Sequence, residues 1–234
     1  MAQKEMAWPR QPDDRQWIKP EGDDPRTLYQ MLKISQDRFG EDLCFGYIPR
    51  YGGERMHLTY NEFGELSTSV AKGLRDIGVE KGDRVAIILD NSVEWAALSY
   101  GANALGAAYT AMYTHQHGDD WAYILKDATP KVVAVANTEV LDKLCGALDA
   151  DSWPSSGVIL IGDEPPNEIP PEGIEVRSWS DLVSAGRSGE DLKEIADDPT
   201  ALSTLIYTSG TTGNPKGVML SNWNTLSNVL CVQG

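Results

Sequence analysis

The residues best suited to chemistry form one hydroxyl- and glycine-rich segment near the end of the chain. Residues 208–217 read TSGTTGNPKG and separate two short apolar runs, 202–207 and 218–220. Glycines let a backbone turn tightly and approach a ligand closely, while hydroxyls, amides and a lysine can bind phosphate oxygens. We therefore predict a loop that binds the phosphates of ATP, made of Thr208, Ser209, Gly210, Thr211, Thr212, Gly213 and Lys216.

The spacing of this segment excludes a Walker A loop. That motif requires G-x-x-x-x-G-K-[ST]. Counting from Gly210, Pro215 stands where the second glycine belongs and Gly217 stands where the hydroxyl residue belongs. A P-loop NTPase is thereby excluded. The remaining alternative to a phosphate site is a polar surface loop that joins two strands.

The overall charge limits the partners of such a loop. The chain has 20 Lys and Arg residues against 35 Asp and Glu residues, which gives a formal net charge of −15. A protein this acidic repels a nucleic-acid backbone, so we expect no nucleic-acid partner. A nucleotide substrate is still compatible, because local loops and magnesium hold a small anion regardless of net charge.

Strands and helices are expected to alternate along the chain that positions the loop. We predict apolar strands at 84–89, 107–113, 131–136, 158–161 and 202–207, separated by helices or connections. This order is typical of a doubly wound α/β layer with a sheet covered on both faces. Upstream, we predict a helix at 27–39, strands at 43–48 and 55–58 with a turn at 51–54, and a helix opened by a Thr59–Glu62 capping box.

Three further segments carry local predictions. Residues 1–25 are polar and proline-rich, so we expect a poorly ordered arm before a domain at 26–234. Asp119 or Asp120 is expected to cap a helix that turns Trp121, Ile124 and Leu125 inward. Residues 163–175 are expected to form a proline-rich surface connection, and 180–195 to be partly helical.

The cysteines and the start of the chain bear on location. Cys44, Cys145 and Cys231 are far apart and odd in number, which fits a reducing compartment better than a disulfide framework or a zinc site. The N-terminal residues lack the apolar core of a signal peptide, and no segment approaches the roughly eighteen apolar residues of a membrane span. We therefore expect a cytoplasmic protein.

Four residues near position 117 have the chemistry of metal ligands. His115, His117, Asp119 and Asp120 have side chains that suit zinc or iron. The alternative, which we prefer, is a strand-to-helix connection in which an aspartate caps the helix. We predict no protein metal centre.

Several motifs together establish a family resemblance. The string YTSGTTGNPKG at 207–217 resembles the phosphate-binding signature of the adenylate-forming superfamily, which includes acyl-CoA synthetases, luciferases and peptide-synthetase adenylation domains. LTYNE at 58–62, GVEKGDRVAI at 78–87 and ALGAAY at 104–109 resemble that family's early helix start, strand entry and turn. The resemblance therefore covers most of the chain and implies the N-terminal part of the large adenylation domain.

The resemblance implies a two-step reaction. A carboxylate attacks the α-phosphate of ATP, which gives an acyl-adenylate and pyrophosphate, and a thiol, usually that of coenzyme A, then displaces AMP. The loop would hold the β- and γ-phosphates, with Lys216 and Mg²⁺ offsetting their charge. The implied substrates and cofactor are ATP, a carboxylic acid, CoA and Mg²⁺.

The choice of acid and the extent of the chain are also expectations from resemblance. Gly40-Glu41-Asp42, the Gly52-Gly53 turn and residues 111–114 resemble long-chain fatty acyl-CoA synthetases, a substrate class compatible with peripheral association with an intracellular membrane. The family's later motifs are absent, so we expect a fragment without its C-terminal domain, inactive alone, whose main catalytic residues lie beyond Gly234. Asn222 stands where relatives often have histidine, and no role is transferred to it. The alternatives are a non-catalytic binding derivative of the same fold, a luciferase-type enzyme and a peptide-synthetase domain.

Overall fold

Seven strands form the main sheet of the protein. The computed structural model describes residues 24–48, 54–162, 167–193, 195–208 and 215–232, with the side chains of 230–232 excepted. The strand order is β7-β6-β5-β3-β4-β8-β9, and every neighbouring pair is parallel except β8 and β9. The bounds are β3 Arg84–Ile88, β4 Ala108–Met112, β5 Val132–Val135, β6 Val158–Leu160, β7 Val176–Ser178, β8 Leu202–Thr208 and β9 Lys216–Ser221.

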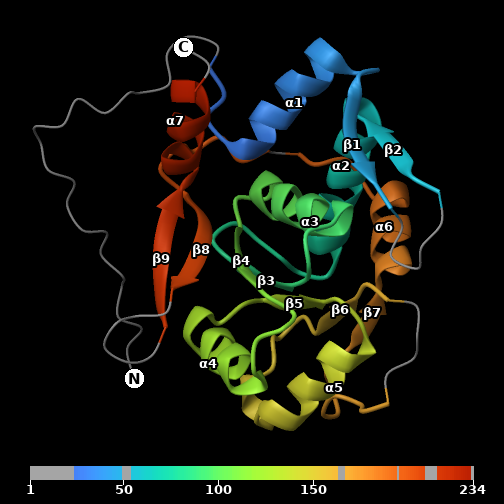
Figure 1. Ribbon diagram of the computed structural model, residues 1–234, viewed down its shortest axis with the longest axis vertical. Helices are drawn as coiled ribbons and strands as arrows, with labels where there is room; N and C mark the ends of the chain where they lie inside the picture. The colour runs from blue at the N-terminus through green and yellow to red at the C-terminus, as the bar shows by residue number, and fades with distance from the viewer. Residues whose placement is uncertain (1–23, 49–53, 163–166, 194, 209–214, 233–234) are drawn as a thin grey trace, which may run out of the picture.

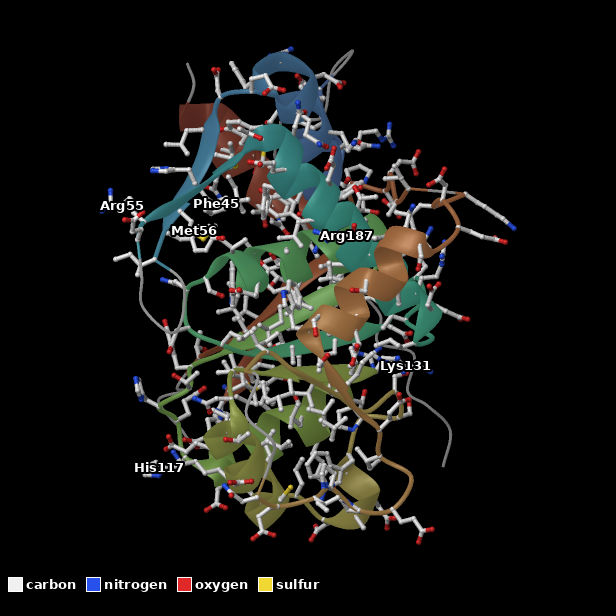
Figure 2. The ribbon with its side chains drawn as sticks, turned by 90° about the vertical axis from the view of Figure 1, so that its right-hand side faces the viewer. Phe45, Arg55, Met56, His117, Lys131 and Arg187 are labelled. Carbon is white, nitrogen blue, oxygen red and sulfur yellow. The ribbon has the colours of Figure 1, made fainter. Side chains whose placement is uncertain are left out.

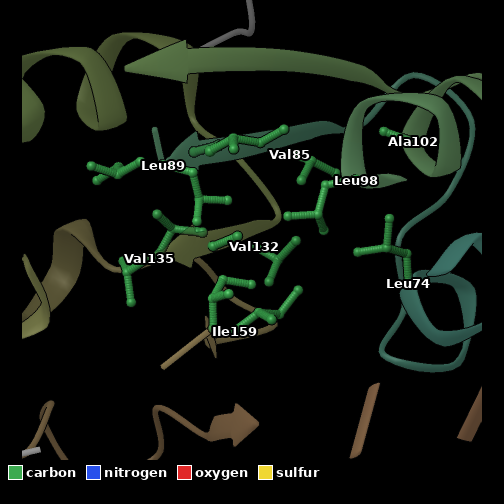
Figure 3. Close-up of a cluster of buried hydrophobic side chains, with 14 of the residues drawn as sticks. Leu74, Val85, Leu89, Leu98, Ala102, Val132, Val135 and Ile159 are labelled. Atoms are coloured by element: carbon green, nitrogen blue, oxygen red, sulfur yellow. The ribbon is translucent and has the colours of Figure 1, made fainter. Parts of the chain in front are cut away.

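The centre of this sheet is apolar on both faces. The side chains of Val85, Ile87, Val133 and Ile159 have no exposed surface, and Figure 3 shows the strands around Val85, Val132 and Ile159 packed together with Leu74 and Leu98 of the covering helices. Uninterrupted apolar strands of this kind are stable only where helices cover both sides. The predicted two-sided sheet is confirmed.

Helices lie on both faces of the sheet. On one side pack α1 (Leu28–Phe39), α2 (Tyr60–Asp76), α3 (Val93–Ala104) and α6 (Trp179–Ser188), and on the other side lie α4 (Gly118–Ala128) and α5 (Thr138–Ala147), as Figure 1 shows. A short 3-10 turn, Ala150–Ser152, follows α5, and α7 (Asn222–Val232) follows β9. This doubly wound arrangement is the predicted fold class.

A small antiparallel ribbon lies apart from the main sheet. It consists of β1 (Leu43–Tyr47) and β2 (Met56–Thr59) and packs on α2 through Phe45, whose ring centroid is 4.7 Å from that of Phe63. Arg55 and Met56 lie on its outer surface (Figure 2). The predicted strands are confirmed, whereas most of the predicted turn lies outside the described residues.

The sequence predicted the start of α2 correctly and the start of α4 incorrectly. In α2, the Thr59 amide donates to Glu62 Oε2 at 2.8 Å and the Glu62 amide donates to Thr59 Oγ1 at 3.2 Å, so the capping box is confirmed. The N-terminus of α4 was predicted wrongly. His117 is the N-cap without a side-chain bond, and Asp119 and Asp120 lie inside the first turn, where the helix dipole favours negative charge.

Two other features test the predicted pattern. Trp121, Ile124 and Leu125 of α4 are buried, as expected. Strand β7 was not anticipated, because three polar or half-buried residues carry no apolar alternation.

The proposed arm at 1–25 falls almost entirely on residues outside the described ranges and stays a prediction. Within those ranges no helix is long and apolar enough to cross a membrane.

Candidate functional site

The predicted phosphate-binding segment connects β8 and β9, which form an antiparallel hairpin at one edge of the sheet. Thr208 ends β8, Lys216 begins β9, and the two are register partners. Both side chains are exposed. The other predicted site residues, Ser209, Gly210, Thr211, Thr212 and Gly213, lie outside the residues that the structure describes. The structure therefore brings together the two ends of the predicted site.

Lys216 is a cation without a counter-charge among the described residues. No carboxylate of those residues lies within ion-pair distance of its ammonium group, although the chain as a whole carries a net charge of −15. An exposed ammonium group that is not neutralised by a neighbouring side chain can attract an anionic ligand. Beside the Thr208 hydroxyl, it has the chemistry that a phosphate group requires.

Strand pairing and a buried hydrogen bond attach the hairpin to the central sheet and to α3. Strand β8 pairs with β4 through Tyr109–Thr204 and Thr110–Leu205. Below these pairs, Ser203 Oγ donates to Asn103 Oδ1 at 2.6 Å, and both side chains are buried. A satisfied polar pair in a buried position fixes the register of the strand against α3.

Close to the tip, Tyr207 is held between β9 and α4. Its hydroxyl donates to Asp127 Oδ2 at 2.6 Å. Across the hairpin, a Cβ atom at Gly217 would lie 3.0 Å from Tyr207 Cζ, so the ring packs closely against the backbone of Gly217. Burial, and next the neighbouring Asp127 carboxylate, raise the pKa of Tyr207, and the hydroxyl remains a proton donor at neutral pH.

Asp127 was not identified from the sequence. It is an exposed aspartate in the last turn of α4, 80 positions before Tyr207, and no motif links the two residues. The one available signal is its location, because a carboxylate near a helix C-terminus opposes the helix dipole.

Asn222, where relatives often have histidine, has a structural role. Its side chain is buried; Oδ1 accepts from the Leu28 amide at 3.3 Å and Nδ2 donates to the Asp198 carbonyl at 3.4 Å. These bonds join the start of α7 to α1 and to the segment that leads into β8. The amide therefore accounts for the residue without an imidazole role.

The described residues offer no protein metal centre. No group of three or more His, Cys, Asp or Glu side chains among them is placed to hold an ion. His117 is exposed at the start of α4 (Figure 2), and His115 is also exposed. A magnesium ion bound largely by substrate phosphates requires few protein ligands.

Known proteins give a consistent match to this chain. The AMP-binding enzyme family matches residues 34–233. The long-chain-fatty-acid–CoA ligase ACSBG1 of Rattus norvegicus is 31% identical over 230 residues, which cover 95% of this chain and 31% of the rat protein. The chain thus spans about a third of the length of that curated relative.

Two solved structures share the fold. A fatty acyl CoA synthetase of Mycobacterium tuberculosis has a TM-score of 0.63 and 24% identity, with 86% of this chain and 36% of that chain covered. The adenylation domain of a carboxylate reductase from Mycobacterium chelonae has a TM-score of 0.69 and 23% identity, with 88% and 35% covered. At this identity the likeness concerns the fold alone.

Proposed function

The chain belongs to the AMP-binding enzyme family, and from this premise we propose that it supplies the ATP-phosphate-binding part of an acid–CoA ligase that activates long-chain fatty acids. The observation that carries the proposal is the exposed Lys216, opposite Thr208 at the base of the signature segment and without an ion pair among the residues that the structure describes. The name of the rat relative supports the long-chain substrate.

The proposed role of these residues is electrostatic. When ATP binds, the Lys216 ammonium and the hydroxyls of Thr208, Ser209, Thr211 and Thr212 would contact the β- and γ-phosphates, which leave as pyrophosphate when the acid attacks the α-phosphate. Donors aimed at the charge that develops on a leaving group lower the barrier more than they strengthen ground-state binding. Mg²⁺ would neutralise part of the same charge.

The location of the activity is part of the proposal. The dispersed cysteines favour a reducing compartment such as the cytoplasm. A long-chain acid partitions into membranes, so peripheral association with a bilayer would bring the enzyme to its substrate.

Product analysis tests this proposal. The protein encoded by the complete gene is incubated with ATP, Mg²⁺, CoA and a series of acids, from short-chain to very-long-chain fatty acids and including an aryl acid. We expect AMP and acyl-CoA to form fastest with long-chain acids. Formation of ADP, or no acyl-CoA with any acid, would contradict the ligase. Preference for the aryl acid would refute the fatty-acid substrate, and light emission or oxygen uptake would indicate a luciferase-type enzyme.

A further inference from the structure

The contact between Tyr207 and Asp127 joins the base of the signature segment to a helix on the opposite side of β8 from α3. The donor–acceptor distance of 2.6 Å is that of a hydroxyl bonded to an ionised carboxylate. Tyr207 is half-buried and Asp127 is exposed. Among the described residues of the hairpin tip, 206–208 and 216–218, it is the side-chain hydrogen bond that reaches a helix.

The position of Asp127 has no explanation within its own helix. It lies in the last turn of α4, where the exposed carbonyls carry partial negative charge and a carboxylate is unfavourable. Its neighbour Lys126 is exposed and makes no ion pair with it among the described residues. What Asp127 does gain is the bond from Tyr207.

Tyr207 transmits this contact to both strands of the hairpin. It lies in β8 and is the register partner of Gly217 in β9, and its ring would lie 3.0 Å from a Cβ atom at Gly217. The next pair along the ladder is Thr208 with Lys216. The Tyr207 ring therefore packs on the register pair directly next to the two predicted phosphate contacts.

We propose that Asp127 is a positioning residue for the phosphate-binding hairpin: by accepting the Tyr207 hydroxyl, it fixes the ring on Gly217 and so aligns Thr208 and Lys216. The inference rests on the proposed function, because it takes the ligand of these two residues to be the phosphates of ATP. Asp127 itself touches no substrate.

The test compares four variants with the wild-type protein. Asp127→Ala removes the acceptor, Tyr207→Phe removes the donor, and Asp127→Asn keeps an amide oxygen that can still accept the hydroxyl. Asp37→Ala is the matched control, since Asp37 is also an exposed aspartate in the last turn of a helix, α1, with no bond to any described residue.

Two readouts separate positioning from general destabilisation. The first is hydrogen exchange of the backbone amides of 216–220 without nucleotide, which we expect to rise roughly fivefold in Asp127→Ala and Tyr207→Phe, the size that one lost hydrogen bond produces. The second is the KM for ATP in the protein from the complete gene, which should rise by a similar factor while the KM for the acid stays unchanged. Asp127→Asn should remain within about twofold of wild type, and the two disruptive changes combined should be no worse than either alone.

Amide exchange in Asp127→Ala that equals wild type overturns the inference. So does a KM for the acid that rises together with the KM for ATP, because that pattern indicates general damage. A wild-type protein that uses no ATP overturns the proposed function instead, and the amide exchange of 216–220 still decides whether Asp127 positions the hairpin.

Discussion

The central strands and the tip of the β8–β9 hairpin differ in polarity and in exposure to solvent. Strand β5 and residues 85–88 of β3 are apolar, and Val85, Ile87 and Val133 have no exposed surface. At the hairpin tip, the register partners Ile206 and Val218 are 47% and 44% exposed, beside the exposed pair of Thr208 and Lys216. The comparison separates two tasks in one sheet: the centre holds the fold together, and the edge presents polar groups where a ligand can reach them.

The base of the hairpin is attached to the core by a buried polar contact. Asn103 of α3 bonds Ser203 of β8, and below the tip Leu205 is buried like a central-strand residue. The hairpin thus changes from core to surface within a few residues of one strand.

The largest effect is expected in the centre of the sheet. Ile87→Ala deletes a fully buried side chain of β3 and should lower the free energy of unfolding by about 2–5 kcal/mol, from lost burial plus the cavity left behind. Ile206→Ala removes the same atoms from a half-exposed position and should cost less than about 1 kcal/mol. Chemical denaturation of both variants is the measurement, and similar losses would refute the division into core and edge.

The buried hydrogen bond between Asn103 and Ser203 is predicted to have the next largest effect on the free energy of unfolding. Asn103→Ala leaves the buried Ser203 hydroxyl without its acceptor and should cost about 1–3 kcal/mol. Ser203→Ala should cost less, because Asn103 still donates to the Ser99 carbonyl at 3.0 Å. In a double-mutant cycle the two losses should be strongly non-additive. Additive losses would mean that the pair does not hold β8 to α3.

A smaller loss is expected at the start of α2, which covers the core but lies away from the hairpin. Thr59→Ala removes the hydroxyl that accepts from the Glu62 amide, while the amide of residue 59 can still donate to Glu62, and the change should lower the free energy of unfolding by about 1 kcal/mol. Thr59→Ser should restore it. Amide exchange should rise in the first turn of α2 and stay unchanged in β9; a change in β9 would show that core and edge are more tightly linked than the structure indicates.

The smallest effect concerns the turn that leads into β8. The Thr200 hydroxyl, and then its amide, hold the pKa of Asp198 below its usual value. A lowered folded-state pKa stabilises above the unfolded pKa, and this stabilisation is lost as pH falls through the folded value. Asp198→Asn should therefore be less stable than wild type at pH 7 by under about 1 kcal/mol, with a gap that closes in acid. A constant gap across pH would contradict this account.

Sequence predicted the centre of the molecule better than its edge. Apolar runs such as 84–89 and the Thr59–Glu62 pair are local signals that specify their own structure, so the strands and the cap were found. The N-terminus of α4 was missed because Asp119 and Asp120 are favourable both as caps and inside a first turn. Asp127 was missed because its partner is 80 residues away, and a contact made only by folding leaves no periodic trace.

The phosphate-binding role of the hairpin is the central claim, and acid-dependent exchange of pyrophosphate into ATP tests it most directly. The protein from the complete gene is compared with its Lys216→Ala, Thr211→Ala double variant, with palmitate as the acid. We predict exchange in the wild type and none above background in the variant, at nearly unchanged stability, since Lys216 is exposed and unpaired among the described residues. Equal exchange by both proteins would contradict the claim, and so would no exchange by either with any acid.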